Sequence, residues 1–137
     1  MEMENDLKRV VYVSERTHTS EASLSKIIAS SKKNNPELGI TGCLLTGRNS
    51  FLQLLEGPKQ TIDKLYLRIS ADNRHKNLLK LNDEEIGERL FSTWLMKLAP
   101  FDDLEWSNKE FESGDFLKIN SEQALNVFIR LNEYSQS

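Results

Sequence analysis

The side chain of Gln53 is a polar group with apolar neighbours on both sides, in the strand-length segment Phe51 to Glu56. Side chains along a β-strand alternate in direction, so in a strand Gln53 would share one face with Phe51 and Leu55. A buried amide must find partners for its carbonyl and its NH2 group, or the fold loses roughly 1–3 kcal/mol. We therefore expect Gln53 to hydrogen-bond another polar side chain or a ligand.

The phenol of Tyr12 and several further polar groups could join Gln53 in one site. Tyr12 belongs to a β-branched segment, 9–14, and could reach the amide if both side chains face a layer of helices. Other polar groups stand toward the ends of two expected helices: Ser31, Asn34, Asn35, Arg68, Asp72, Arg74 and His75. Taken singly, such residues more often belong to a turn or a solvated helix end. Taken together, they predict a polar pocket between two helices with basic groups at one end, suited to a flat ligand with an anionic tail.

The segment around Gln53 predicts a β-hairpin. Two runs of strand length, Ile40 to Thr46 and Phe51 to Glu56, flank the turn-forming residues 47–50. The earlier strand over 9–14 has apolar residues on both faces: Val10 and Tyr12 with Ser14 on one, Val11 and Val13 on the other. We expect this earlier strand to be a central one, covered on both sides.

Apolar residues at helical spacing predict two helices in the same part of the chain. The first begins near Ser20, ends before Pro36, and has the stripe Leu24, Ile27, Ile28 and Ser31. The second begins at Gly57-Pro58, with proline at its first position, and ends near residues 72–75. Its stripe is Ile62, Leu65, Tyr66 and Ile69, with Arg68 beside it.

Two more strands are expected before residue 98. A short one covers Leu78–Leu81, and residues 83–89 form a polar turn. The last strand covers Leu90–Leu98 and carries Ser92, Trp94, Met96 and Leu98 on one side. The resulting order is β-α-β-β-α-β-β.

This order predicts an α+β fold, a ferredoxin-like sandwich with an extra strand. Each β-α-β unit implies a right-handed crossover between parallel strands, which would place both helices on one face of the sheet. The other face needs a cover, and residues 99–137 are the material available for it. In this extension Ser121 caps a helix with Leu125, Phe128, Ile129 and Asn132 on one face and Ala124, Val127 and Leu131 beside it. We thus divide the chain into residues 1–98 and a C-terminal helical extension, 99–137.

Composition narrows the class of protein. A chain of 137 residues and 15.8 kDa is large enough for one two-layer core. A net charge of −3 without a basic block disfavours a nucleic-acid partner, and no apolar run approaches the ~20 residues that span a bilayer. The polar, acidic N-terminus predicts no signal peptide, and the single Cys43 fits a reducing cytoplasm. Two histidines and one cysteine far apart make a metal site improbable.

Five segments together resemble the BLUF domain, a flavin-binding blue-light sensor module. They are RVVYVS (9–14), SSKKNNPELGITGCLL (30–45), SFLQLLEG (50–57), LYLRISADNRH (65–75) and ERLFSTWLMKL (88–98). These segments span roughly residues 8 to 98, in the order and spacing of the family. The resemblance implies a ferredoxin-like sandwich with a noncovalent flavin between its two helices, usually FAD, with FMN or riboflavin as alternatives.

The resemblance also implies roles for individual residues. Tyr12 and Gln53 would be the photoactive pair, with Gln53 between the tyrosine hydroxyl and flavin N5 and O4. Ile27 and Ile69 would sandwich the isoalloxazine ring, and Asn34 and Asn35 would contact it with Ser31 nearby. Arg68, Asp72, Arg74 and His75 match positions on the ribityl, phosphate or entrance side. Trp94 and Met96 match fifth-strand residues that relay the state of the glutamine.

The implied mechanism is a reversible switch without turnover. Blue light excites the flavin, Tyr12 donates an electron and then a proton through Gln53, and the amide returns rotated or tautomerised. A new hydrogen bond to flavin O4 then shifts the absorption slightly to the red. The family often carries an aromatic residue where this chain has Thr46, so the end of the hairpin could pack differently.

The extension after Leu98 contains no effector motif, so the chain resembles the short, stand-alone type of this family. In that type, output generally runs through self-association and a separate protein partner. We therefore expect a non-enzymatic, cytoplasmic photoreceptor that forms homo-oligomers and signals to another protein, without a nucleic-acid or membrane partner.

Three other functions remain as alternatives. A small phosphohydrolase on the same scaffold could use Arg74 or Asn35, and it would turn over substrate in the dark. An RNA-binding sheet suits the strand order, but the acidic balance and the lack of a basic-aromatic strand motif count against it. A flavin oxidoreductase is disfavoured by the resemblance, because the Tyr12–Gln53 pair would cycle electrons internally.

Overall fold

The computed structural model describes residues 6–16, 37–46, 50–72, 75–92, 94–98 and 119–136 of the chain. At residues 16, 46, 75, 94–98 and 133–136 it describes the backbone alone. The first expected helix, over residues 20–35, lies outside the described part.

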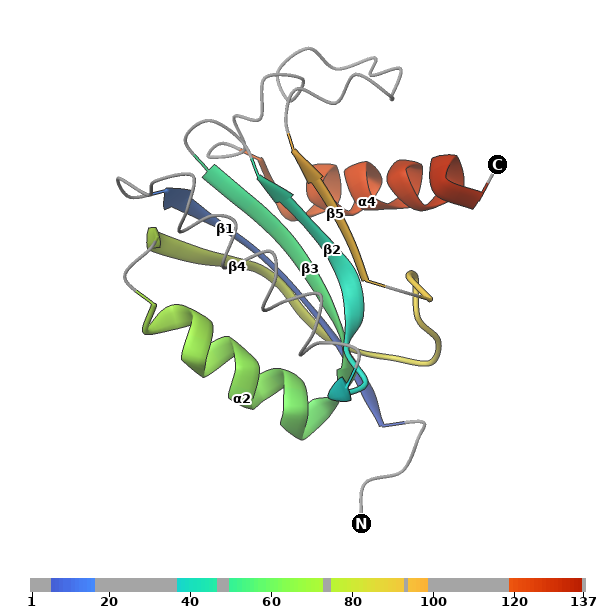
Figure 1. Ribbon diagram of the computed structural model, residues 1–137, viewed down its shortest axis with the longest axis horizontal. Coiled ribbons are helices and arrows are strands. Elements are labelled where there is room, and N and C mark those ends of the chain that lie inside the picture. The colour runs from blue at the N-terminus through green and yellow to red at the C-terminus, as the bar shows by residue number, and fades with distance from the viewer. Residues whose placement is uncertain are drawn as a thin grey trace.

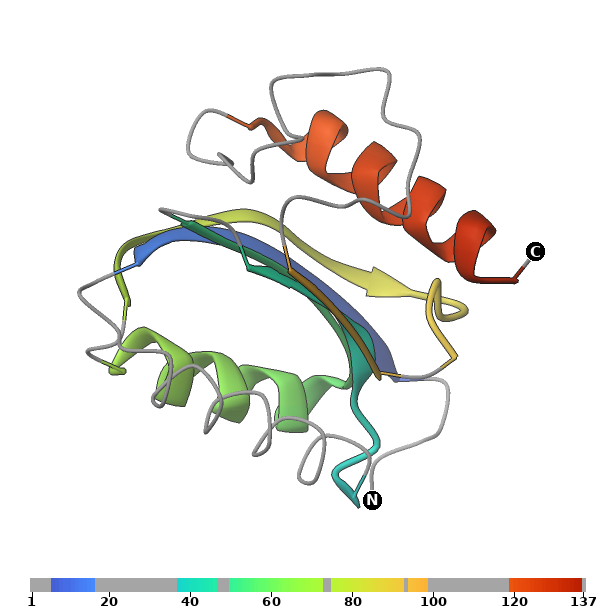
Figure 2. The same ribbon diagram turned by 45° about the horizontal axis from the view of Figure 1, so that its top comes forward.

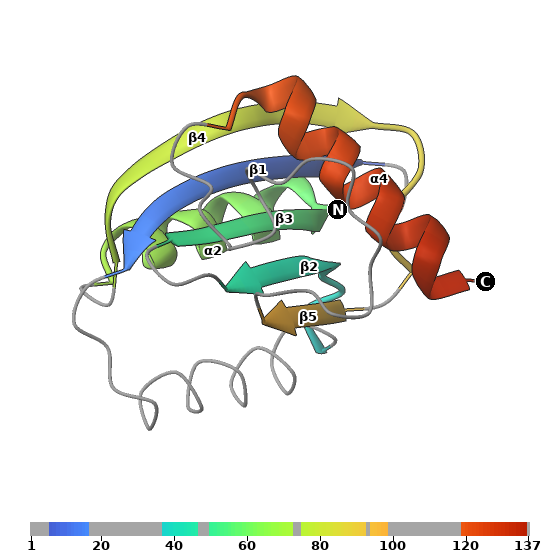
Figure 3. The same ribbon diagram turned by 90° about the horizontal axis from the view of Figure 1, so that it is seen from above.

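The described strands form one five-stranded sheet with the order β4-β1-β3-β2-β5 (Figures 1 and 3). Their bounds are β1 Leu7–Arg16, β2 Thr41–Thr46, β3 Ser50–Pro58, β4 His75–Ile86 and β5 Trp94–Leu98. β1 pairs antiparallel with β3 and β4, β2 pairs antiparallel with β3, and β5 pairs parallel with β2. β1 and β2 are therefore parallel to each other with β3 between them, which is the predicted ferredoxin-like arrangement with an extra edge strand.

One face of the sheet is covered by α2, Lys59–Ser70. Its stripe packs on an α2-side cluster made of Val10, Tyr12, Ile40, Leu55 and Ile62, with Leu65, Tyr66, Ile69 and Leu78 against it. Val10 and Tyr12 thus share one face of β1, as their alternation predicts. Pro58 is the N-cap of α2 rather than its first helical residue, a difference of one position.

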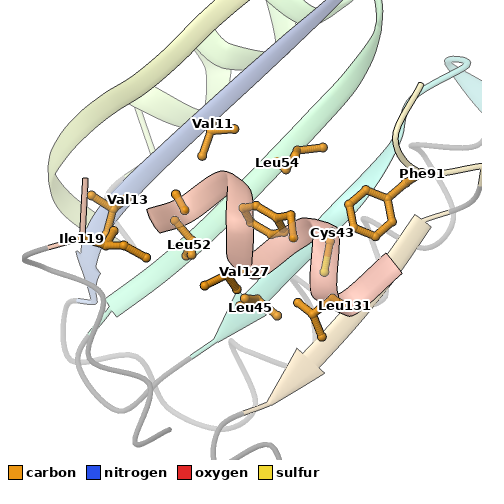
Figure 4. Close-up of a cluster of buried hydrophobic side chains, with 12 residues drawn as sticks. Val11, Val13, Cys43, Leu45, Leu52, Leu54, Phe91, Ile119, Val127 and Leu131 are labelled. Atoms are coloured by element: carbon orange, nitrogen blue, oxygen red, sulfur yellow. The ribbon is translucent and has the colours of Figure 1, made fainter. Parts of the chain in front are cut away.

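The opposite face is covered by α4, Ser121–Gln136 (Figure 2). The α4-side cluster between helix and sheet is shown in Figure 4. Its members are Val11, Val13, Cys43, Leu45, Leu52, Leu54, Phe91, Ile119, Ala124, Val127, Phe128 and Leu131. Cys43 is accordingly a buried core residue without a disulfide.

The prediction for the start and the buried face of α4 was partly wrong. The cap is Asn120, one residue before Ser121: the amide of Gln123 donates to Asn120 Oδ1, and the amide of Asn120 donates to Gln123 Oε1. These reciprocal bonds form a capping box. Ile129 is 40 % exposed, whereas Phe128 is fully buried. The stripe is therefore one residue earlier on the helix than the face predicted from Leu125, Phe128, Ile129 and Asn132.

The polar turn predicted over residues 83–89 was also wrong at its beginning, because β4 continues to Ile86. Asp83, Glu84 and Glu85 are register partners of residues 10, 9 and 8 in β1. Glu84 pairs with Arg9 Nη1 at 3.1 Å, and Asp83 with Lys8 Nζ at 2.8 Å. Glu85 pairs with a lysine at the start of α2. Basic groups distant in sequence thus stabilise an acidic segment as a strand.

β5 begins at Trp94 rather than at the predicted Leu90. The backbone amides of Leu90 and Phe91 donate to the carboxylate of Glu56 instead of to a neighbouring strand. The apolar run from residue 90 is therefore divided between a connecting segment and a short edge strand.

Candidate functional site

Tyr12 and Gln53 lie side by side in the middle of the sheet. They are register partners on β1 and β3, and their exposed fractions are only 4 % and 5 %. The hydroxyl of Tyr12 donates a hydrogen bond to Gln53 Oε1. The pairing considered from the sequence is thus present, on the face that α2 covers.

The NH2 group of Gln53 has no hydrogen-bond acceptor among the described residues, although the side chain is buried. Leaving such donors unsatisfied costs about 1–3 kcal/mol. The Tyr12 hydroxyl uses the carbonyl end of the amide, so the donor end remains available for another acceptor. This asymmetry makes the amide a candidate for contact with a ligand.

The environment of Tyr12 keeps its hydroxyl protonated. Burial raises the pKa of the Tyr12 phenol well above its ordinary value, and the nearby Tyr66 and Asp72 raise the pKa further. Tyr66, on α2, meets Tyr12 edge to face, with 6.0 Å between ring centroids and 71° between planes. Water exclusion and this aromatic contact fix both the protonation and the orientation of the phenol.

Tyr66 and Lys80 are neighbours of the site that sequence reasoning missed. The Lys80 ammonium lies 4.4 Å from the centre of the Tyr66 ring, and Lys80 is the register partner of Tyr12 on β4. Burial raises the pKa of Tyr66. The helical spacing identifies Tyr66 only as part of an apolar stripe; the contact with Tyr12 depends on how α2 crosses β1.

The end of α2 brings some of the predicted residues toward Tyr12. Ile69 packs against the α2-side cluster. Asp72, just after the helix, is near enough for its charge to raise the pKa of the Tyr12 phenol. Arg68 is in the last turn of α2 with an exposed side chain.

The described part of the chain does not include several of the residues named in the sequence analysis, or includes only their backbone. Ile27, Ser31, Asn34, Asn35 and Arg74 lie outside the described residues, and of His75 and Thr46 only the backbone is described.

The backbone of β5 places Trp94 and Met96 in the register of the sheet. Gln53 pairs with Leu44 on β2, and Leu44 pairs with Met96 on β5. Met96 thus belongs to the row of residues that contains Gln53. Trp94 pairs with Gly42, two residues along, in the next row on the same side of the pleat.

The described residues give no sign of a membrane segment or a metal site. No helix among them is long and apolar enough to cross a bilayer. Nor do they contain a group of three or more His, Cys, Asp or Glu side chains that could hold a metal ion.

The chain matches known proteins over most of its length. Residues 7–97 match the family model BLUF, described as sensors of blue-light using FAD. The photoactivated adenylate cyclase subunit beta of Euglena longa is 35 % identical over 98 residues, which cover 70 % of this chain and 11 % of that protein. The chain thus spans about a tenth of the curated relatives it matches.

Two solved structures match nearly the whole chain. The dark-state structure of BlrB, a BLUF protein, has a TM-score of 0.76 and 28 % identity, and covers 98 % of this chain and 100 % of that one. The BlsA ground state has a TM-score of 0.73 and 27 % identity, covering 90 % and 87 %. With the family model matching about two thirds of the sequence, this chain belongs to the BLUF family of blue-light sensors that use FAD.

Proposed function

We propose that this protein senses blue light through FAD bound noncovalently beside α2, and that Tyr12 and Gln53 are the groups that respond. The observation that carries the proposal is the buried Tyr12–Gln53 hydrogen bond, in which the donor end of the amide has no acceptor among the described residues. The edge of an isoalloxazine ring carries nitrogen and carbonyl acceptors, so it fits the unsatisfied NH2 group. FAD, when bound and excited by blue light, supplies the electron acceptor.

The chain's own residues control where the proton goes. The raised pKa of Tyr12 keeps the phenol neutral in the dark, and its proton can leave along the hydrogen bond to Gln53 Oε1. Rotation of the Gln53 amide exchanges its donor and acceptor ends while the backbone stays in place. The switch is thus a rearrangement of hydrogen bonds around a buried amide, and it reverses when the amide returns.

The remaining flavin contacts are carried over from the family resemblance. Ile69, packed beside Tyr12, would cover one face of the ring, and Ile27 the other. The polar contacts would come from Ser31, Asn34, Asn35, Arg68, Asp72, Arg74 and His75. The position of Asp72 next to the Tyr12 environment supports this assignment. FMN or riboflavin could take the same site, because the ring contacts are common to all three.

Output runs through protein contacts rather than through catalysis in this proposal. The whole BlrB chain and 87 % of the BlsA chain match this one, which supports output through contacts of the sensor unit itself. Trp94 and Met96 would relay the state of Gln53, and the extension over residues 99–137 would contribute to self-assembly or to binding a separate partner protein in the cytoplasm. The packing of α4 against the sheet gives this extension a direct connection to β1 and β3.

The visible absorption spectrum tests the proposal. Purified protein with bound flavin should show a flavin band that shifts slightly to the red after blue light and recovers in the dark. A protein that stays colourless after reconstitution with FAD, or a flavin band that does not shift, would contradict it.

Gln53→Leu separates the switch from flavin binding. Leucine fills similar space but has neither donor nor acceptor, so flavin should remain bound while the red-shifted state disappears. The measurement is the light-minus-dark difference spectrum at equal flavin loading. Gln60→Leu is the matched control, because it makes the same substitution at an exposed position in the first turn of α2, and it should retain the shift. Normal photoconversion of Gln53→Leu would remove Gln53 from its proposed role.

A further inference from the structure

Glu56 is a charged residue buried in the apolar face of the sheet. It follows Leu52 and Leu54 on the side of β3 that packs against α4, and its exposed fraction is 0 %. A carboxylate is stable at such a place only if its oxygens are well supplied with donors. Alternation along the sequence puts Glu56 on the same strand face as Leu52 and Leu54, but it does not identify the partners of the carboxylate.

The carboxylate of Glu56 is held by one side chain and two backbone amides. Arg9 donates from Nε to Oε2 at 2.9 Å and pairs through Nη2 at 2.8 Å. The amide of Phe91 donates to Oε1 at 2.8 Å, and the amide of Leu90 lies 2.9 Å from both oxygens. Hydrogen bonds to a charged acceptor are stronger than neutral ones, so these contacts form a firm junction.

Arg89 extends the junction to β2. Its Nη1 donates to the backbone carbonyl of Glu56 at 3.2 Å and to Thr41 Oγ1 at 2.8 Å. Three consecutive residues, 89–91, are therefore hydrogen-bonded to the open end of the β2–β3 hairpin, where β2 begins and β3 ends. Trp94, the first residue of β5, follows only three positions after Phe91.

Phe91 connects the same junction to α4. Its ring is buried in the α4-side cluster (Figure 4). It meets the ring of Phe128 edge to face, with 6.2 Å between centroids and 87° between planes. Glu56 thus joins β3, through the segment 89–91, to both β5 and α4.

We propose that Glu56 is a positioning residue that sets β5 and α4 relative to Gln53, and so determines how the state of the amide reaches them. Gln53 and Glu56 are three residues apart on one strand, with Gln53 on the α2 side and Glu56 on the α4 side. β5 is an edge strand of five residues that pairs with β2 alone among the described strands. The position of β5 therefore depends on the hydrogen bonds that hold residues 89–91, the segment before it. The inference rests on the proposed light response for its input.

Glu56→Gln tests the junction with little change in volume. The amide offers one acceptor oxygen, and its NH2 group must face either the backbone amides of residues 90 and 91 or the Arg9 guanidinium, both of which are donors. We expect at least about tenfold faster hydrogen exchange over residues 90–98. The red shift should still form, because Tyr12 and Gln53 are untouched, but the dark recovery rate should change severalfold and light-induced changes in exchange of α4 should be lost.

Arg89→Met gives a second test if Glu56→Gln folds poorly, because it removes the outer contacts without leaving a buried charge unpaired. Arg89→Met should change the hydrogen-exchange rate of residues 90–98 and the dark recovery rate in the same direction as Glu56→Gln does, by smaller factors. Val13→Ala is the control for general destabilisation, since Val13 is buried in the α4-side cluster on β1 and makes no contact with the junction's hydrogen bonds. It should lower stability while recovery and the response of α4 stay as in the parent protein.

The outcomes separate the two proposals. If the unmodified protein shows no red shift, the proposed function itself fails. If it shifts but Glu56→Gln and Arg89→Met recover at the parent rate, or if Val13→Ala alters recovery and the α4 response equally, Glu56 is a structural residue only and the inference is overturned.

Discussion

Tyr12 and Gln53 form a polar pair where the surrounding sheet is apolar. Burial excludes water from the side chains of Tyr12 and Gln53, so only the protein or a ligand can supply their hydrogen-bond partners. Tyr12 donates to the carbonyl end of the amide, and the NH2 group of the amide has no acceptor among the residues that the structure describes. Burial also makes the neutral phenol the stable form, because the pKa of Tyr12 is raised.

The raised pKa of Tyr12 predicts a loss of stability at alkaline pH. In the unfolded chain this phenol ionises near its ordinary pKa of 10.0, while in the folded protein it stays protonated. The unfolded state alone therefore releases a proton as the pH rises above 10, and the free energy of unfolding falls. The contribution of Tyr12 should be about 1.4 kcal/mol at pH 11.

Urea unfolding of the parent protein and of Tyr12→Phe, at pH 8 and at pH 11, measures this contribution. The variant loses one buried hydrogen bond at both pH values, but its stability should decline less between them. An equal decline in the two proteins would mean that Tyr12 ionises normally in the fold.

The hairpin of β2 and β3 contains a position that only glycine can occupy. Gly42 has a φ of +144°, and a Cβ placed there would lie 2.0 Å from the carbonyl oxygen of Leu54. No side chain fits so close to a backbone oxygen, so any substitution must displace β2 from β3. Because Gly42 is also the register partner of Trp94, such a displacement would reach β5.

Gly42→Ala should accordingly lower the free energy of unfolding by about 1–3 kcal/mol. Gly87→Ala is the matched control, since a Cβ at Gly87 would meet no atom within 4 Å. Chemical denaturation of both variants gives the comparison. Equal stability of the two would show that the hairpin tolerates a side chain at Gly42.

The elements differ in how far their own sequence determines them. The faces of β1 and β3 follow from alternation, because each face packs against apolar side chains. Only the Leu78–Leu81 part of β4 is predicted by its local pattern: Asp83 and Glu84 resemble a turn until Lys8 and Arg9 are placed beside them. The start of β5 is likewise decided by Glu56, a residue more than thirty positions away.

Some residues of the candidate site could likewise be predicted from the sequence, and others could not. Alternation gives the strand face on which Tyr12 and Gln53 each lie, but not that the two faces are on the same side of the sheet; the structure has the hydrogen bond between them. Tyr66 could not be recognised as a neighbour of Tyr12, because helical periodicity gives the buried stripe of α2 but not its crossing point on the sheet. The photochemical roles of Tyr12 and Gln53 stay predictions until light is applied.

At the scale of the molecule, the described residues form a sheet with α2 on one side and α4 on the other (Figure 2). Tyr12 and Gln53 lie on the side of α2, while the α4-side cluster contains apolar side chains of β1, β2 and β3. In the proposed function, chromophore binding takes place on the side of α2 and output on the side of α4. α4 should contribute to stability as a core element.

Phe128→Ala and Ile129→Ala test that contribution with neighbouring residues. Phe128 is fully buried and Ile129 is 40 % exposed, so truncation should cost about 3–5 kcal/mol at Phe128 and under about 1 kcal/mol at Ile129. Thermal or urea unfolding measures both. Comparable losses would indicate that α4 packs with the face predicted from sequence rather than the one described.

The central position of β1 also affects how the chain can fold. β1 is the first strand in sequence, yet its two neighbours are β3 and β4, so one of its edges stays open until β3 ends at Pro58 and the other until β4 ends at Ile86. Contacts of such long sequence range make folding slow compared with helical proteins of this size. A chain interrupted before β4 would present one long unpaired edge of β1, and strand exchange between molecules would be its characteristic failure.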